Sequence, residues 1–233
     1  WADGETGTVA GPTQFTTVNR TLQPTNNVGA QVSITRRALR QSGQGLEQAI
    51  RRDLSNALRV EMDRAAMLGS GSGGEPTGLL NSGITSTAAD AAPTFGLFLT
   101  ELSAFMVDNA VTDPSQVTVL VRPEVFAAME SASDADLQTT EWRRLTSMVG
   151  RVTTTSNALP APTGSPAASP ALLTTETGGQ PPLYVGAWGA LDLVRDVYTN
   201  AASGGLLITA ISTMDIAAGR TEQARQITGL QAG

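Results

Sequence analysis

The chain has 233 residues, of which 40% are hydrophobic and 15% charged, and its formal net charge is −6. This length can bury one or two cores, and a net acidic chain is a poor non-specific ligand for DNA. Cysteine, histidine and lysine are absent, which excludes disulfides, Cys/His zinc sites and nucleophilic catalysis with a histidine base.

The N-terminal part, residues 1–41, predicts an extended segment that carries a hairpin. Residues 15–22 read as extended, residues 23–27 (QPTNN) favour a turn, and residues 28–34 alternate apolar and polar side chains. An isolated two-stranded hairpin is marginal in water. This hairpin therefore needs neighbouring structure to pack against, which its own domain could supply.

A long amphipathic helix is predicted from Leu46 to Leu68. At 1.5 Å per residue it would be roughly 34 Å long. Polar and charged residues occupy the opposite face, and Glu47 and Arg51 are spaced for a favourable pair one turn apart. The predicted core face consists of Leu46, Ile50, Leu54, Leu58 and Met62.

A glycine-rich turn follows the helix and is predicted to form a flexible joint. Its defining residues are Gly69, Gly71, Gly73, Pro76 and Gly78. A phosphate-binding loop would instead follow a strand, open a helix and, in the P-loop, carry a lysine. The order and composition found here exclude that interpretation.

The rest of the chain predicts alternating helices and strands. Helices are expected from Phe95, Pro123 and Glu141, with strands over 117–121, 150–156, 206–217 and the closing 222–227. Residues 158–182 hold six of the twelve prolines and predict a long surface loop.

Acidic side chains offer two alternatives to a purely structural role. Glu130, Asp134 and Asp136 form a solvated loop or, less favoured, a cation site, which would need more oxygen ligands. Hydrolase chemistry would need two carboxylates that flank a cleft, and a pair in sequence such as Asp134 and Asp136 does not establish one. Glu61 and Asp63 point about 200° apart on a helix. We therefore predict no enzymatic activity, no catalytic residues, no cofactor and no metal. No stretch approaches the roughly 18 apolar residues of a membrane span.

Three runs together resemble the HK97-type major capsid proteins of tailed bacteriophages. They are the helix ending in DRAAMLGSGSGGEPTGLLN, the run VTVLVRP before a helix, and LYVGAW followed by LVRD. The resemblance implies an α+β capsid fold with an E-loop hairpin in 1–41, a spine helix and first part of the P-domain in 42–112, an A-domain in 113–212 and a closing P-domain strand in 213–233. The opening at Trp1 fits the family's habit of losing an N-terminal segment during maturation.

The resemblance also implies function and partners. The chain would assemble through hexamers and pentamers into an icosahedral-type shell around double-stranded DNA, as in a phage virion or gene transfer agent formed in the bacterial cytoplasm. Portal, scaffold or protease, and cement proteins would be further partners; an encapsulin-like shell around an enzyme is the alternative. The predicted inter-subunit residues are Phe15, Val18, Leu22, Val28, Val32, Arg36 and Arg37.

Overall fold

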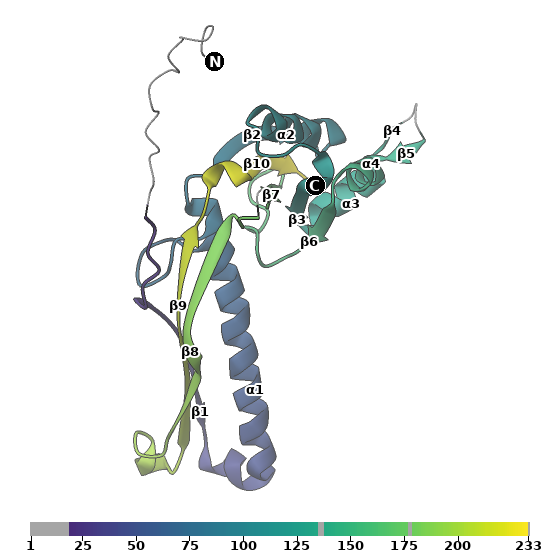
Figure 1. Ribbon diagram of the computed structural model, residues 1–233. Coiled ribbons are helices and arrows are strands. Elements are labelled where there is room, and N and C mark those ends of the chain that lie inside the picture. Colours follow the sequence, from purple (N-terminus) through teal and green to yellow (C-terminus); the bar gives the residue numbers. More distant parts are fainter. Residues whose placement is uncertain (1–18, 135–137, 177–178, 233) are drawn as a thin grey trace, which may run out of the picture.

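The computed structural model describes residues 19–134, 138–176 and 179–232. The molecule is elongated and consists of a rod and a body (Figure 1). The rod combines helix α1 with a three-stranded antiparallel sheet in the order β1-β9-β8. Its elements are α1 (Arg36–Leu68), β1 (Asn26–Ile34), β8 (Leu183–Asp196) and β9 (Leu206–Ala218).

Helix α1 begins ten residues earlier than the sequence pattern predicts. Thr35 is its N-cap, and the Thr35 hydroxyl accepts a hydrogen bond from the Ala38 N–H at 3.3 Å. With 33 residues the helix is about 50 Å long. The predicted domain boundary at 41/42 therefore falls inside α1. Tertiary packing explains the difference, because Ala38 and Leu39 contact the apolar cluster of the rod.

Strand β1 pairs with β9 rather than with the segment before it. The register runs from Asn26 opposite Met214 to Ile34 opposite Leu206. Residues 19–22 form no strand, and 15–18 lie outside the described residues. The predicted E-loop hairpin between 15–22 and 28–34 is therefore not formed by the described part of the chain. Pairing with β9 places the apolar side chains of β1 over α1, which buries them within one subunit.

The core of the rod lies between α1 and its sheet. Leu54 and Leu58 are buried against Ile34, Leu206 and Ile208. Two further residues of the predicted core face, Leu46 and Ile50, are partly buried against the same cluster.

The body is a five-stranded mixed sheet in the order β2-β10-β7-β3-β6. Its apolar core packs α2, α3 and α4 against one face of the sheet. The predicted order of helix, strand and helix at 95–131 is confirmed, as are the helix at Glu141 and the closing strand. The elements are β2 (Thr85–Ala91), α2 (Phe95–Val107), β3 (Val117–Val121), α3 (Pro123–Ser131), the small pair β4 (Ser133–Asp134) and β5 (Thr139–Thr140), α4 (Glu141–Met148), β6 (Arg151–Thr154), β7 (Ala168–Thr175) and β10 (Ala224–Gln231); short 3₁₀ turns occur at Leu79–Asn81, Pro114–Gln116, Ala201–Ser203 and Thr221–Gln223.

The proline-rich segment contains the central strand of this sheet, so the prediction of a long surface loop over 158–182 is wrong. Strand β7 pairs with β10 on one side and with β3 on the other. Ala171, Leu172 and Leu173 are fully buried or nearly so. Pro170 lies opposite an irregularity between Ile227 and Leu230, where its missing N–H interrupts no regular ladder.

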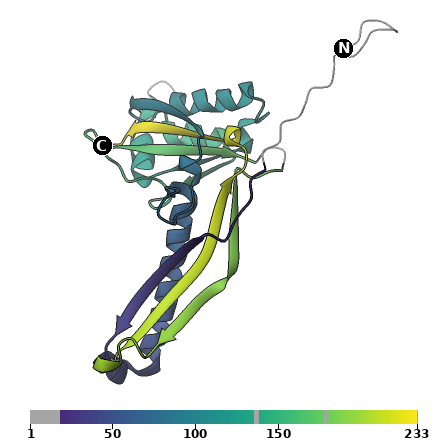
Figure 2. The same cartoon turned by 90° about the vertical axis from the view of Figure 1, so that its left-hand side faces the viewer.

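Rod and body are interleaved along the chain rather than divided into consecutive domains. The chain passes between them after α1, between β7 and β8, and between β9 and β10 (Figure 2). The predicted boundary at 112/113 separates α2 from β3, although both contribute to one core. The boundary at 212/213 falls inside β9. Strand pairing across the interior, which local sequence patterns do not report, decides these boundaries.

Candidate assembly site

The predicted inter-subunit residues fall into three groups. Phe15 and Val18 lie outside the described residues. Val28 and Val32 are partly buried and pack toward α1 in the rod core, and a contact between them and a neighbouring subunit stays a prediction. Arg36 and Arg37 are exposed at the free end of the rod and form no ion pair within the part of the chain that the structure describes. A contact between them and another subunit stays a prediction.

Leu22 is half-buried on the outer face of the rod sheet, the face opposite α1. A Cβ atom placed on Gly186 would lie 3.2 Å from Leu22 Cδ1 and 3.1 Å from the Trp188 ring. The Asp215 carboxylate accepts hydrogen bonds from the Gln23 N–H at 2.8 Å and from Asn26 Nδ2 at 3.1 Å. Residues 22–26 are therefore held against their own sheet.

The outer face of the rod sheet exposes large apolar side chains that the sequence analysis did not single out. Trp188 lies opposite Thr213 and Val194 lies opposite Thr209, so both share the face of Ile211. All three are exposed, and Tyr198 at the tip of the rod is 85% exposed. Between Trp188 and Asp192 the register with β9 is irregular, but even-numbered residues of β8 face outward on both sides of the irregularity.

The glycine turn forms the elbow, the junction of residues 69–81 between α1 and the body. Ser70 and Thr77 form an antiparallel bridge, and the Gly78 N–H donates to the Gly69 carbonyl at 2.9 Å. Gly71 and Gly73 have φ values of +70° and +66°, and Pro76 is buried. The predicted flexible joint is thus a small hydrogen-bonded hairpin.

Close backbone packing at the elbow explains why residue 78 is glycine. A Cβ atom on Gly78 would lie 2.4 Å from the Gly69 nitrogen and 2.6 Å from the Met67 carbonyl oxygen. We expect Gly78→Ala to lower the free energy of unfolding by about 1–3 kcal/mol through overpacking. Chemical denaturation measures the loss. The control Gly45→Ala, with no atom within 4 Å, should instead raise stability by about 0.5–1 kcal/mol. Equal effects of the two changes would contradict the clash.

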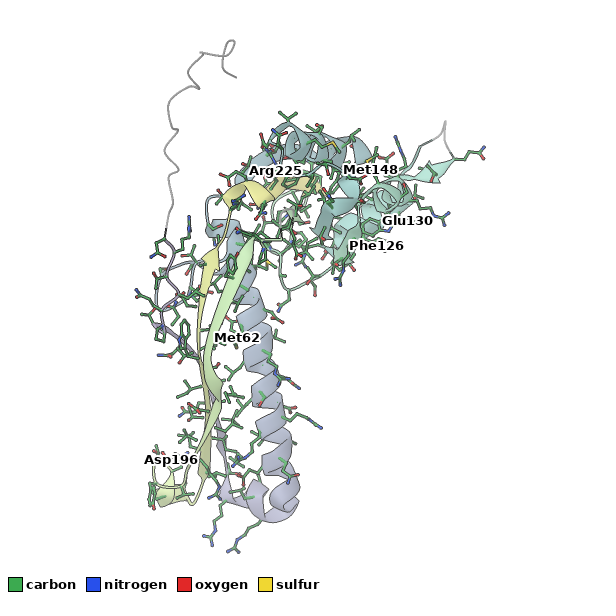
Figure 3. All side chains as sticks on the ribbon, in the orientation of Figure 1. Met62, Phe126, Glu130, Met148, Asp196 and Arg225 are labelled. Carbon is green, nitrogen blue, oxygen red and sulfur yellow. The ribbon has the colours of Figure 1, made fainter. Side chains whose placement is uncertain are left out.

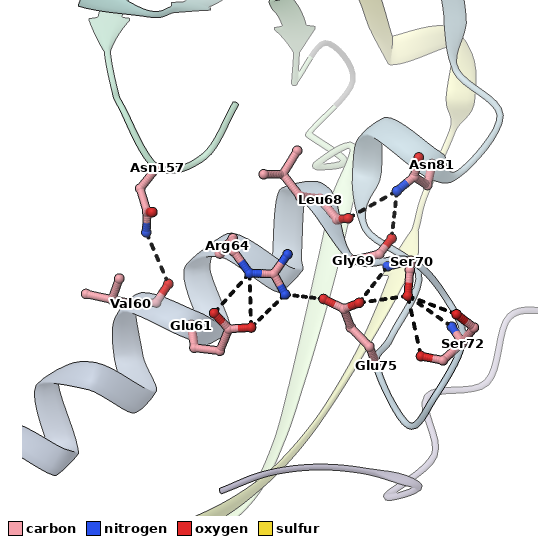
Figure 4. A network of polar contacts seen from close by, with 10 residues as sticks. All are labelled: Val60, Glu61, Arg64, Leu68, Gly69, Ser70, Ser72, Glu75, Asn81 and Asn157. Carbon is pink, nitrogen blue, oxygen red and sulfur yellow. Dashed lines mark hydrogen bonds and ion pairs between the residues drawn. The ribbon is translucent and has the colours of Figure 1, made fainter. Parts of the chain in front are cut away.

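A charged network ties the elbow to the last turns of α1 (Figure 4). The Arg64 guanidinium contacts Glu61 on the same helix, with Nη2 to Oε1 at 2.6 Å, and also Glu75 on the turn. The Glu75 carboxylate accepts from the Ser70 hydroxyl at 2.7 Å and from the Ser70 N–H at 3.1 Å. Asn81 Nδ2 donates to the Leu68 and Gly69 carbonyls at 3.1 and 2.8 Å, which satisfies carbonyls at the end of the helix.

These contacts change the protonation chemistry of the elbow. Hydrogen bonds from the Ser70 hydroxyl and N–H, followed by the Arg64 pair, hold the pKa of Glu75 below its ordinary value of 4.5. The Glu61 and Glu75 carboxylates raise the pKa of Arg64. Both groups are therefore charged across the physiological range, and the network is an ionic tie rather than a proton-transfer site.

The depressed pKa of Glu75 predicts an acid-sensitive elbow. Because the folded-state pKa lies below the unfolded value, ionised Glu75 stabilises the fold above the unfolded pKa, and this stabilisation is lost as pH falls through the folded pKa. We expect the melting temperature of the wild type to exceed that of Glu75→Gln at pH 7. The difference between the two melting temperatures should shrink as the pH falls below 4.5. Thermal unfolding of both proteins at pH 7 and at a pH below 4.5 measures this difference. A difference that persists unchanged in acid would contradict this linkage.

An open cavity of about 550 Å³ lies beside the elbow, lined by residues of β1, α1 and the glycine turn, with Met62 of the predicted core face and Met214 in its wall. Among the described residues, no three His, Cys, Asp or Glu side chains gather as a metal site would require. No helix in the described ranges is long and apolar enough to cross a membrane. The rod, the hydrogen-bonded elbow and the exposed apolar side chains of the outer sheet face are features suited to contacts between proteins.

The family model described as "Phage capsid family" matches residues 1–225. The chain belongs to the phage capsid family. As a member of it, the chain is a structural protein, a major capsid protein that forms a shell. No curated protein sequence matches the chain.

Solved structures of phage capsid family and related shells share the fold. The capsid of a native GTA particle is 15% identical, with a TM-score of 0.68 over 98% of this chain and 81% of that chain. A structure of Mycobacterium phage Che8 is 16% identical, with a TM-score of 0.61 over 95% of this chain and 82% of that chain. The SrpI encapsulin complex from Synechococcus elongatus PCC 7942 is 15% identical, with a TM-score of 0.58 over 91% of this chain and 75% of that chain. At these identities the likeness concerns the fold.

Proposed function

We propose that this capsid protein assembles through hexamers and pentamers into an icosahedral-type shell that encloses double-stranded DNA. The observation that carries the proposal is the family match over residues 1–225. The rod supplies a stiff strut, and its exposed end and outer sheet face offer surfaces for neighbouring copies. Heterologous contacts of this kind close into rings, and many weak contacts made together hold a shell.

The partners follow from the same proposal. They are copies of this chain, a portal, a scaffold or protease, and cement proteins, in a virion assembled in the bacterial cytoplasm. The net charge of −6 supports a wall that encloses DNA without binding it specifically. The proposed role needs no cofactor.

The absence of lysine predicts how the shell is held together. Some members of the family join subunits by an isopeptide bond between lysine and asparagine side chains, and this chain has no lysine. We therefore expect shells held by non-covalent contacts or by a cement protein. Boiled in detergent, the particles should run as a single monomer band in gel electrophoresis. A ladder of covalent oligomers would overturn this prediction.

Electron microscopy of the purified chain, expressed alone and with its neighbouring genes, tests the proposed assembly. Closed shells, or rings of five and six subunits, are the expected result. A chain that stays monomeric at high concentration in both preparations would refute the proposal.

An encapsulin-like compartment is the second candidate, favoured by the similarity in fold to the SrpI encapsulin complex. The contents of native particles separate the two functions. Nuclease-protected DNA would support the capsid, whereas a single co-purifying enzyme and no DNA would support the compartment.

A further inference from the structure

Two kinds of contact hold the elbow between rod and body. Apolar packing comes from a joint cluster shared by both parts, which consists of Leu79, Ile84, Leu159, Leu172, Ala218 and Ala224. Such packing is non-directional. The polar contacts of the elbow are directional, and those of Glu75 are also charge-assisted, so they constrain orientation more closely than burial alone.

The polar contacts link the end of the rod to the start of the body in two steps. Arg64 of α1 forms an ion pair with Glu75, and this pair attaches the hairpin at 70–77 to α1. Asn81, just past the hairpin, donates hydrogen bonds to the carbonyls of Leu68 and Gly69. We call Arg64, Ser70, Glu75 and Asn81 the elbow lock.

Little else in the elbow can take up a change of angle. Gly69 and Gly78 pack back to back, and a Cβ atom on Gly69 would lie 2.1 Å from the Pro76 carbonyl oxygen. Another polar contact from the body to α1, between Asn157 Nδ2 and the Val60 carbonyl, is long at 3.5 Å (Figure 4). The Arg64–Glu75 ion pair is thus the charged contact that joins the glycine turn to α1.

We propose that the elbow lock sets the angle between rod and body and thereby the curvature of the assembled shell. The inference rests on the proposed function, because curvature has meaning only for a subunit that tiles a closed surface. In closed assemblies, the rotation between neighbouring contacts decides whether and where the surface closes. Arg64 and Glu75 are positioning residues in this sense, since they act through the placement of the body.

The two partners of Arg64 provide a matched pair of variants. Glu75→Gln removes the ion pair between the hairpin and α1, whereas Glu61→Gln removes only an ion pair within α1. Each change removes one carboxylate charge from the same guanidinium. We expect Glu75→Gln particles to show a shifted or broadened distribution of diameters in electron microscopy, and Glu61→Gln particles to keep that of wild type. Identical distributions for all three proteins would overturn the proposal.

A second measurement keeps the proposal testable when assembly fails. Small-angle X-ray scattering of the dissociated subunit reports its maximum dimension and shape. A changed shape for Glu75→Gln, with Glu61→Gln matching wild type, would support the lock, and an unchanged shape would refute it. Wild-type protein that never forms shells would instead count against the proposed function, because the scattering comparison needs no shell.

Discussion

Leu54→Asp is expected to abolish folding of the rod and with it all assembly. Leu54 is buried against the sheet of the rod, in the cluster that also holds Leu58 and Ile208. Loss of the leucine side chain alone lowers the free energy of unfolding by about 2–5 kcal/mol. The unpaired buried carboxylate lowers it further through its desolvation penalty. The free energy of unfolding of a typical domain is only about 5–15 kcal/mol. Circular dichroism and size-exclusion chromatography of the expressed variant measure the result.

A neighbouring position on the same helix supplies the control. Asn56 is exposed on α1, and Asn56→Asp introduces the same carboxylate with almost no change in shape. This variant should fold and assemble like wild type. Normal shells from Leu54→Asp, or equal defects in both variants, would show that the buried face of α1 is assigned wrongly.

Arg225→Met is expected to cause the second-largest loss, because it leaves a carboxylate buried without its ion pair. Arg225 on β10 contacts Glu101 of α2, with Nη1 to Oε2 at 3.3 Å, as well as Asp108. Its guanidinium lies 5.4 Å from the centre of the Phe105 ring. Glu101 is buried, and breaking a buried pair from one side costs about 3–5 kcal/mol. Denaturant unfolding measures the change in the free energy of unfolding.

Two further variants separate the lost ion pair from general damage to the body. Arg225→Met combined with Glu101→Leu should recover much of the stability, since an apolar pair can replace a buried ion pair. Arg51→Met removes the partly exposed pair with Glu47 on α1 and should cost less than about 1 kcal/mol. A double variant as unstable as Arg225→Met alone would contradict this account.

Local patterns determined the elements whose signal lies within one segment. The apolar positions of α1 recur at spacings of three and four, and this spacing selects one helix face wherever the helix begins. The run at 117–124, with Pro123 at the first position of α3, predicts a strand followed by a helix because both signals are local. The missing cysteine, histidine and lysine excluded whole classes of chemistry without any structure.

The start of α1 and the position of β7 depend on tertiary contacts. Serine and two glycines at 42–45 weaken the local helical signal, yet packing on the sheet continues the helix back to Arg36. Prolines around β7 signal a loop, and only its place between β10 and β3 makes it a strand. In both cases burial outweighs intrinsic propensity.

The sequence by itself determined the family, the helix phase and the absence of histidine, cysteine and lysine chemistry, because these depend on residue types and short spacings. The tertiary structure decided which strand covers α1, where rod and body divide, and that Arg64 meets Glu75 across the elbow. The alternation in β1 predicts which side chains are buried but not that the partner is β9, about 180 residues later. Period-two patterns fix the face of a strand, whereas its partner is selected by long-range packing of the whole chain.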